Sequence, residues 1–461
     1  MSKGKISAVC KWVLPLVPAY CLVVLAAVLL LYGAAMIPQE SVRQNFVRSA
    51  DTLCENDVFF HVQEGVFPSF IDRYADSILL NIAWNLRPDP GSLMWTAYYT
   101  DEYQNENENL YASVNEDLSA NQEYVRYWHG SAAVVRILHR ALDIRSIYLL
   151  HGIILVVLTI LLLILLIRRK MLIEASALSV GLIGVSIWFV PLSLEYYWTF
   201  LCMLLASVLI LILEEKGKAG WIPVLLLVTG MVTAYLDFLS TETITLTVPL
   251  LLLYRQRLGR ESRQQNKRDI GQKTGTHNKS DSSLKEMQSA GITSYLVYCL
   301  IWALGYVGMW TTKWMLAACI TKENVIPYIK GHVAERIGTQ TPVLKLPIHL
   351  LTTLKRNLQG LFPFGYGAAG IVCGIGILLV LAYVAYVFHG KQKPGGSMIL
   401  YGLLIAIPYV RYLVLHDHAY LHAFFTYRAQ LVVIMVIWIL FCETTDLSEI
   451  KNLMKRRFFK K

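Results

Sequence analysis

The densest group of residues able to do chemistry lies between positions 411 and 428, where histidine, arginine and aromatic residues alternate. If this stretch is helical, His418 and His422 fall at i and i+4 on one face. That spacing can hold a metal ion or present two N–H donors to a phosphate. Arg411 and Arg428 would add fixed positive charge for the same anion. We therefore predict a phosphate-binding site here.

Two other interpretations of this stretch stay open. The histidine and aromatic side chains could lie at the membrane interface, where lipid headgroups satisfy them. They could also form a structural zinc site, although the sequence offers only His416 or Asp417 as a third ligand. We expect an anion site that does not require a metal, with a divalent cation as an optional cofactor.

Carboxylates stand at two further points where apolar runs begin or end. Asp76 opens the run from Ile78 to Trp84, and Asp237 and Glu242 occupy a turn between two apolar segments. A carboxylate can take the proton of an attacking hydroxyl, and ionisable groups near a membrane usually mark substrate contact. Asp76 is the first candidate for a catalytic base, Asp237 the second, and Glu242 a candidate substrate ligand. Helix capping would explain Asp76 as well.

An aromatic motif, Tyr-Trp-His-Gly, precedes the second long apolar run and contains Trp128 and His129. Arg126 and Arg136 flank it. Aromatic residues and arginine at this position are typical of the interfacial belt of a membrane protein. They are also suited to contacting a polar substrate, so Trp128 and His129 are candidate substrate-binding residues.

The elements that must position these groups are helices in a membrane. The chain has 461 residues, of which 55% are apolar and only 16% charged, and the apolar residues gather in runs near membrane-spanning length. We predict an all-α polytopic membrane protein of about ten transmembrane helices, with a long first extracytoplasmic loop. The expected spans are near 13–34, 148–167, 171–191, 196–213, 221–237, 241–254, 294–316, 364–388, 397–415 and 424–442.

The distribution of lysine and arginine predicts the orientation of these spans. Basic residues follow every even-numbered span, and no lysine occurs between Lys11 and Lys170. By the positive-inside rule both termini are cytoplasmic, and the protein is a multi-pass protein of the cell membrane. The predicted regions are 1–34 (N-terminus and first helix), 35–147 (extracytoplasmic loop), 148–254 (helices two to six), 255–292 (flexible basic cytoplasmic linker), 293–316 (helix seven), 317–363 (basic extracytoplasmic loop), 364–443 (helices eight to ten) and 444–461 (basic cytoplasmic tail).

The two external loops differ in charge. The first holds sixteen acidic residues against eight arginines, and its stretches 71–85 and 124–142 have the periodicity of amphipathic helices lying on the membrane or across the mouth of the bundle. The second carries six basic residues against two acidic ones. Such an excess favours anionic headgroups or a lipid phosphate, although a solvated loop face would also explain it. The six are Lys322, Lys330, Arg336, Lys345, Lys355 and Arg356.

Several classes of function find no support in the sequence. It contains neither a Walker loop nor a Gly-rich dinucleotide motif after a strand, so a nucleotide-driven pump or a Rossmann-type enzyme is not indicated. We also expect no nucleic-acid partner. Any substrate must come from the membrane or from outside the cell.

This layout resembles the GT-C type of polytopic glycosyltransferases, which take a sugar from a polyprenyl-phosphate donor at the outer face of the membrane. The resemblance lies in the cytoplasmic start, the long acidic first external loop and the late external stretch with histidine and arginine. The segments 127–130, 237–241 and 418–428 also look like patterns in uncharacterised bacterial membrane proteins. The chain departs from better-known members because Asp76 lies about forty residues beyond the first span, not soon after it.

The resemblance implies a transferase that moves a sugar from polyprenyl phosphate to a cell-envelope glycan, lipid or protein on the extracytoplasmic face. It would make Asp76 or Asp237 the base, and His418, His422, Arg428 and Arg411 the donor-phosphate ligands. The expected partners are the lipid-linked sugar, membrane lipids and the acceptor. The main alternative is a transporter or flippase of a lipid-linked envelope precursor, and a subunit without catalytic activity is a third.

Overall fold

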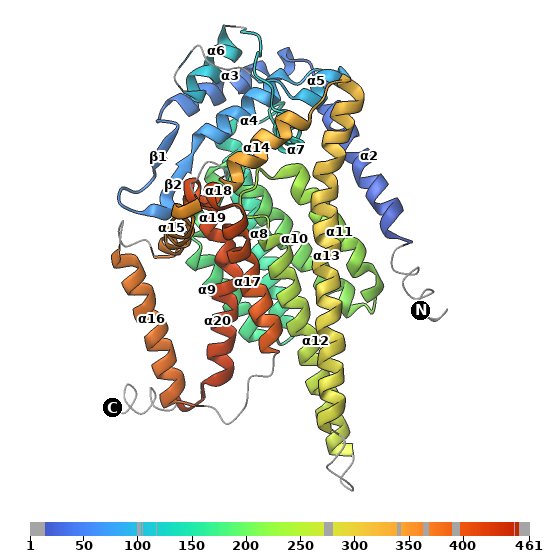
Figure 1. The fold of residues 1–461 in the computed structure, drawn as a ribbon, viewed down its shortest axis with the longest axis vertical. Coiled ribbons are helices and arrows are strands. Elements are labelled where there is room, and N and C mark those ends of the chain that lie inside the picture. Colours follow the sequence, from blue (N-terminus) through green and yellow to red (C-terminus); the bar gives the residue numbers. More distant parts are fainter. Residues whose placement is uncertain are drawn as a thin grey trace.

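The computed structural model describes most of the chain, and helices make up about four fifths of the described part (Figure 1). The described residues are 14–98, 103, 105–116, 118–271, 280–338, 343–362, 368–389, 397–446 and 448–450. The predicted cytoplasmic ends, 1–13 and 451–461, fall outside them, so the orientation of the chain in the membrane stays a prediction.

Seven described helices or helical runs are long and apolar enough to cross a membrane, which indicates a multi-pass membrane protein. Several place many large apolar side chains on the outside of the bundle, where lipid would cover them. The seven are α2 (Leu16–Ala35), α8 (Ile144–Arg168), α10 (Leu194–Glu215), α11 (Ile222–Leu236) with η3 (Ala219–Trp221), α13 (Ser280–Thr321), α16 (Ala368–Val387), and α20 (Leu431–Thr444) with α19 (Ala423–Thr426) and η5 (Tyr427–Gln430).

The other three predicted spans are apolar helices too short to qualify. They are α9 (Leu172–Gly184), which η2 (Ile187–Leu192) follows, α17 (Met398–Val414) and the apolar first part of α12 (Ile244–Gly271). The 13 residues of α9 rise only about 20 Å, less than the roughly 30 Å of a bilayer core. α9 and α17 pack on α20, and α12 packs on α10. Seven of the ten predicted spans thus have, among the described residues, the length and composition of a membrane-crossing helix, and the count of ten stays a prediction.

The segment 255–292, predicted as a flexible linker, is helical where the structure describes it. α12 runs on to Gly271 and α13 starts at Ser280, while residues 272–279 lie outside the described part. Arg257 and Arg260 bind Glu214 at the end of α10, with N–O distances of 2.8 and 3.2 Å. The polar composition that indicated a linker is compatible with a helix, because Arg, Gln and Glu have high helix propensity.

The first predicted external loop folds into a helical cap. Its elements are α3 (Glu40–Cys54), β1 (Phe59–His61), η1 (Phe67–Ser69), β2 (Phe70–Asp72), α4 (Arg73–Asn85), α5 (Pro90–Trp95), α6 (Glu106–Asn115) and α7 (Gly130–Leu138). The strands pair antiparallel, with Phe59 opposite Asp72. α4 begins where the Asp72 side chain accepts the Ala75 N–H at 2.8 Å. Its residues 76–84 are all buried, so the amphipathic stretch 71–85 lies inside the cap and not on the membrane surface.

Helices of both predicted external loops gather at one end of the bundle (Figure 1). The second loop contributes α14 (Ile326–Ile337), η4 (Val343–Lys345) and α15 (Leu346–Gln359). The short helix α18 (His416–Leu421), between α17 and α19, packs against both α14 and α15. The acidic cap, the basic loop and the histidine-rich stretch thus meet at this end. The end of α12 and the start of α13 lie at the opposite end of the bundle (Figure 1).

Candidate active site

A polar cavity of about 360 Å³ opens where these three regions meet. Acidic groups come from the start of α4 and of α10, basic and imidazole groups from α14, and two further histidines from the stretch around α18. Its size is within the usual range of ligand sites. The ionisable and imidazole side chains that line it include Asp72, Glu195, Arg126, His332, Arg336, His418 and His422.

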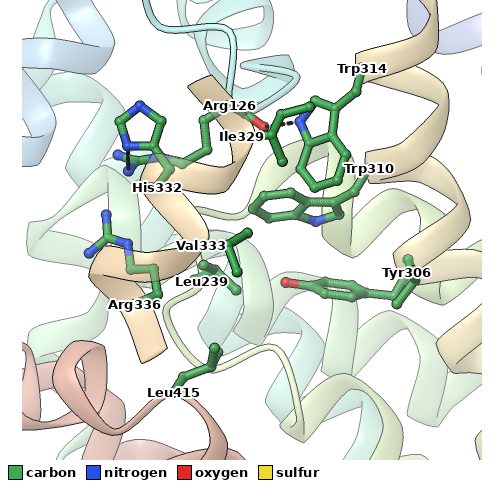
Figure 2. A pocket seen from close by; sticks show the side chains of 11 residues that line it. Arg126, Leu239, Tyr306, Trp310, Trp314, Ile329, His332, Val333, Arg336 and Leu415 are labelled. Atoms are coloured by element: carbon green, nitrogen blue, oxygen red, sulfur yellow. Dashed lines mark hydrogen bonds between the residues drawn. The ribbon is translucent and has the colours of Figure 1, made fainter. Parts of the chain in front are cut away.

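A second, apolar pocket of about 210 Å³ adjoins the polar cavity. Figure 2 shows Trp310 and Trp314 on α13 facing Ile329 and Val333 on α14. Tyr306 extends the wall formed by α13 within the candidate span 292–321. We call this pocket, lined by Tyr306, Val307, Trp310, Trp314, Ile329, Val333, Leu239 and Leu415 together with the three residues described next, the lipid-facing groove.

Arg126, His332 and Arg336 line both the groove and the polar cavity, so the two spaces adjoin at these residues. Arg126 donates to Nδ1 of His332 at 3.0 Å, and the Trp314 indole donates to the Arg126 carbonyl at 3.3 Å. The Arg126 guanidinium also lies 3.7 Å from Glu335. A cationic boundary therefore separates an apolar compartment from an acidic one.

Arg336 differs from Arg126 because no acidic partner holds it. Among the described residues no salt bridge reaches Arg336, and its Nε atom is buried without a hydrogen bond. Its charge acts electrostatically on Glu195, His418 and His422 across the cavity. An unpaired guanidinium in such a place is suited to a phosphate, which it can bind through two parallel N–H groups.

Asp72 and Glu195 form the acidic side of the cavity. Asp72 is buried, and the Glu195 carboxyl lies within hydrogen-bonding reach of it. Burial raises the pKa of Asp72 to about 7, and the nearby Asp76 charge also raises it, against the hydrogen bonds from Ala75 and Glu195. A carboxylate with its pKa near neutrality is suited to general base catalysis.

His418 and His422 both line the cavity, but they do not lie on one continuous helix. α18 ends at Leu421, yet the two rings lie 4.7 Å apart between centroids. Burial lowers the pKa of His418 well below its usual value and that of His422 to about 3. Both are therefore neutral and can act as hydrogen-bonding groups, not as cations.

The other two predicted phosphate ligands are engaged elsewhere and do not line either space in the described structure. Arg411 binds Glu242 at 2.9 Å and donates to the Leu239 carbonyl. Arg428 donates to the carbonyls of Pro68 and Phe424, both at 3.1 Å. These contacts join the bundle to the 237–242 turn and to the cap hairpin, so they build the walls of the site.

The predicted substrate-binding residues Trp128, His129 and Glu242 also lie outside the lining of the described cavity. The Trp128 indole donates to the Met309 carbonyl at 2.7 Å, and His129 Nε2 lies 2.9 Å from the Tyr124 carbonyl. Their motif is fixed by Gly130, where an added Cβ would lie 2.2 Å from the Tyr235 ring. Glu242 is held by Arg411, as described above. The motif thus connects the cap to α13.

The two predicted bases are buried near the cavity, and both are hydrogen-bonded within the protein. Asp237 accepts the Ser240 N–H and hydroxyl, and burial together with the Glu242 charge raises its pKa to about 7. Asp76 accepts hydrogen bonds from Tyr148, Ser193 and the Leu194 N–H, at 2.5, 3.1 and 2.8 Å. Neither lines the cavity in the described part of the chain, whereas Asp72 does.

We expect Asp76→Ala to destabilise the fold, by about 2–4 kcal/mol, because it leaves three buried donors without their acceptor. Thermal unfolding in detergent, followed by size-exclusion chromatography, measures this. Asp89→Ala is the control, because Asp89 lies at the surface, where it accepts the exposed Ser92 N–H at 3.0 Å, and its replacement should cost about 1 kcal/mol. Equal losses for the two variants would contradict the structural role of Asp76.

Sequence reasoning missed Asp72, Glu195 and His332, and it named Arg336 only as one of six basic residues. The signal for Asp72 was present, because it opens the same amphipathic stretch as Asp76. Glu195, at the first turn of a candidate span, is the kind of membrane-boundary carboxylate that the same argument selects. Comparison with protein-family models, with curated proteins and with solved structures found no match for this chain.

Proposed function

We propose that this protein is a membrane glycosyltransferase that moves a sugar from a polyprenyl-phosphate donor to a hydroxyl group of a cell-envelope glycan, lipid or protein. The reaction takes place at the extracytoplasmic face. The observation that carries the proposal is that the lipid-facing groove and the polar cavity meet at three shared lining residues, Arg126, His332 and Arg336. The three parts of a polyprenyl-phosphate sugar match this arrangement in order: the apolar chain fits the groove, the anionic phosphate fits the shared basic residues, and the sugar fits the polar cavity.

In this proposal the isoprenoid chain enters from the membrane. It lies against Tyr306, Trp310 and Trp314, within the candidate span 292–321. Val307, in the same wall, is 60% exposed, so this side of α13 is accessible to lipid. Burial of the chain supplies binding energy in proportion to the apolar area covered.

The phosphate then lies at Arg336, with Arg126 and His332 beside it, and the sugar occupies the polar cavity. The acceptor oxygen attacks the anomeric carbon while the bond from that carbon to the phosphate oxygen breaks. Asp72, assisted by Glu195, takes the acceptor proton. The electron pair leaves with the lipid phosphate, whose growing negative charge Arg336 stabilises. The neutral His418 and His422 are placed to hydrogen-bond sugar hydroxyls.

The test is a transfer assay with the purified full-length chain in nanodiscs, a panel of radiolabelled polyprenyl-phosphate sugars and an envelope extract as acceptor. We expect a labelled product with wild-type protein and none with empty nanodiscs. Absence of transfer, together with movement of a labelled lipid-linked precursor between leaflets of proteoliposomes, would overturn the proposal in favour of a flippase.

Blocking the groove gives a more specific prediction. Val307→Trp should lower kcat/KM roughly tenfold, about 1.4 kcal/mol, for a long-chain donor and much less for a donor with two isoprene units. Val307 lies on the exposed wall of the groove formed by α13 and not on the α14 turn that carries His332 and Arg336, so a short chain held at that turn does not reach the filled part of the groove. Ile377→Trp on α16 is the matched control, since Ile377 is 53% exposed on another candidate span. Equal effects on both donors would contradict chain binding in the groove.

A further inference from the structure

A cluster of metal-ligand side chains lies beside the proposed active site and takes no part in the chemistry described above. It consists of His349 on α15 with His416 and Asp417 on α18. The three ligand atoms all lie within 4.8 Å of one another. Nε2 of His349 is 2.7 Å from Oδ1 of Asp417, and Nδ1 of His416 is 3.1 Å from the same oxygen.

These separations fit a metal site. A tetrahedral zinc ion with bonds of about 2.0–2.2 Å holds its ligand atoms about 3.3 Å apart. The two nitrogens and the oxygen can reach this arrangement with small side-chain movements. Two imidazoles and one carboxylate are a ligand set that zinc uses, whereas magnesium and calcium prefer oxygen ligands alone.

The state of His349 is a second observation that points to a ligand. Its Nε2 atom is shielded from solvent and makes no hydrogen bond, although Asp417 lies close to it. A buried imidazole nitrogen normally has a hydrogen-bond partner. The close contact without hydrogen-bond geometry is what two ligands of a shared cation would show.

The surrounding structure holds the three ligands in place without the ion. Thr353, one turn after His349, donates to the His349 carbonyl at 2.9 Å and lies 3.4 Å from the His416 carbonyl. Asn357, one turn further, donates to the Ala419 carbonyl at 2.9 Å. α15 and α18 are thus joined by buried polar contacts that keep the ligands near each other, and the partial exposure of Asp417 leaves a coordination position for water.

The end of α14 also touches this cluster. Gly338, at the C-cap of α14 with φ of +73°, has no side chain, and a Cβ there would lie 2.3 Å from the His416 ring and 2.6 Å from Asp417. Arg336 is two residues before Gly338, and His418 is one residue after Asp417. The cluster therefore lies where the elements that carry the proposed phosphate ligand and a cavity histidine meet.

We propose that Nε2 of His349, Nδ1 of His416 and Oδ1 of Asp417 bind one divalent transition-metal ion, with Zn²⁺ the best fit, and that water fills the fourth position. The ion joins α15 to α18 and fixes both against the end of α14. It lies outside the polar cavity and has no role in the transfer step. The inference goes beyond the proposed function, because metal binding does not depend on the reaction catalysed.

The experiment measures metal binding by the full-length protein in nanodiscs after treatment with a chelator. Zn²⁺ affinity is obtained by competition with a chromophoric chelator, and Co²⁺ is added as a spectroscopic probe. We expect one Zn²⁺ per chain and the visible absorption of tetrahedral Co²⁺. His349→Ala and Asp417→Asn should weaken Zn²⁺ binding at least 100-fold, more than the 10–100-fold typical of losing an outer-shell partner. The exposed His389→Ala is the control and should bind like wild type.

His349→Cys keeps the inference testable if the other variants fold poorly. A cysteine thiolate at position 349 should retain the metal and add a sulfur-to-cobalt charge-transfer band, which appears only if that side chain is a ligand. The proposal is overturned if wild-type protein binds no stoichiometric Zn²⁺. It is also overturned if the His349 and Asp417 variants bind as tightly as His389→Ala, or if the cysteine variant binds Co²⁺ without the new band.

Discussion

Replacing Asp72 by asparagine should reduce sugar transfer by about 10²–10⁴-fold while the protein stays folded. Asp72 lines the polar cavity and is the carboxylate that we propose as the base. Asparagine keeps the side-chain oxygen that accepts the Ala75 N–H, so the start of α4 is preserved, but it cannot take a proton. The transfer assay in nanodiscs, with unfolding temperature measured in parallel, separates loss of chemistry from loss of structure.

The control for this variant is Asp89→Asn, because Asp89 also caps a helix through its side-chain oxygen and lies outside the cavity. It should leave transfer unchanged. If Glu195→Gln abolishes transfer and Asp72→Asn does not, Glu195 is the base. If neither change reduces transfer, the reaction does not take place in this cavity.

The pH dependence of transfer follows from the environment of Asp72. Burial raises its pKa to about 7, above the ordinary value of an aspartate. The base must be ionised to accept a proton, so kcat/KM should fall about tenfold per pH unit below pH 7 and level off above it. A pH profile of kcat/KM for wild-type protein, measured with donor well below its KM, checks this. A rate that is constant from pH 5 to 8 would contradict a base with a raised pKa.

Replacing Arg336 by glutamine should lower kcat/KM about 10²–10³-fold, because it removes the cation proposed to stabilise the leaving phosphate. Arg336→Lys should recover part of the rate, since lysine keeps the charge but not the paired N–H groups. Steady-state kinetics with a lipid-linked donor gives the effect. Inhibition by the lipid phosphate product should be weaker for Arg336→Lys than for the wild type, and weakest for Arg336→Gln.

Arg356→Gln is the matched control for charge. Arg356 belongs to the same basic loop, but its guanidinium stacks on Tyr420 at 4.3 Å and lies outside both pockets. Its loss should change kcat/KM less than threefold, within the range of a single surface charge. Equal losses at positions 336 and 356 would mean that the loop acts through its net charge and not through one placed arginine.

Most of the fold could be predicted from the apolar pattern. All ten predicted spans correspond to apolar helices in the structure, and the start of α4 at residue 73 agrees with the amphipathic stretch 71–85. The length of each helix could not be predicted, because a run such as 171–191 is interrupted at Ser186, which has φ of 55°. Periodicity does not show whether a short apolar helix spans a membrane or packs inside a bundle.

The candidate site was predictable only in part. His418 and His422 line the cavity, since they share a short segment in which local spacing decides whether two rings meet. Asp76 and Arg428 have the residue types expected of a site, yet their polar atoms are engaged by Tyr148 and Pro68. The sequence gives the type of a side chain but not the groups that form hydrogen bonds with it in the folded protein.

The sequence by itself determined that the chain has apolar segments long enough to cross a membrane, and that the segments 35–147 and 317–363 carry acidic and basic charge, because hydrophobicity and charge depend on residue type and short-range order. Tertiary structure alone decided that Asp72, Glu195 and Arg336 share a cavity, and that His349 reaches His416 and Asp417. These groups belong to helices distant in the chain. Their meeting depends on how the helices pack, and neither spacing nor composition encodes that within any one segment.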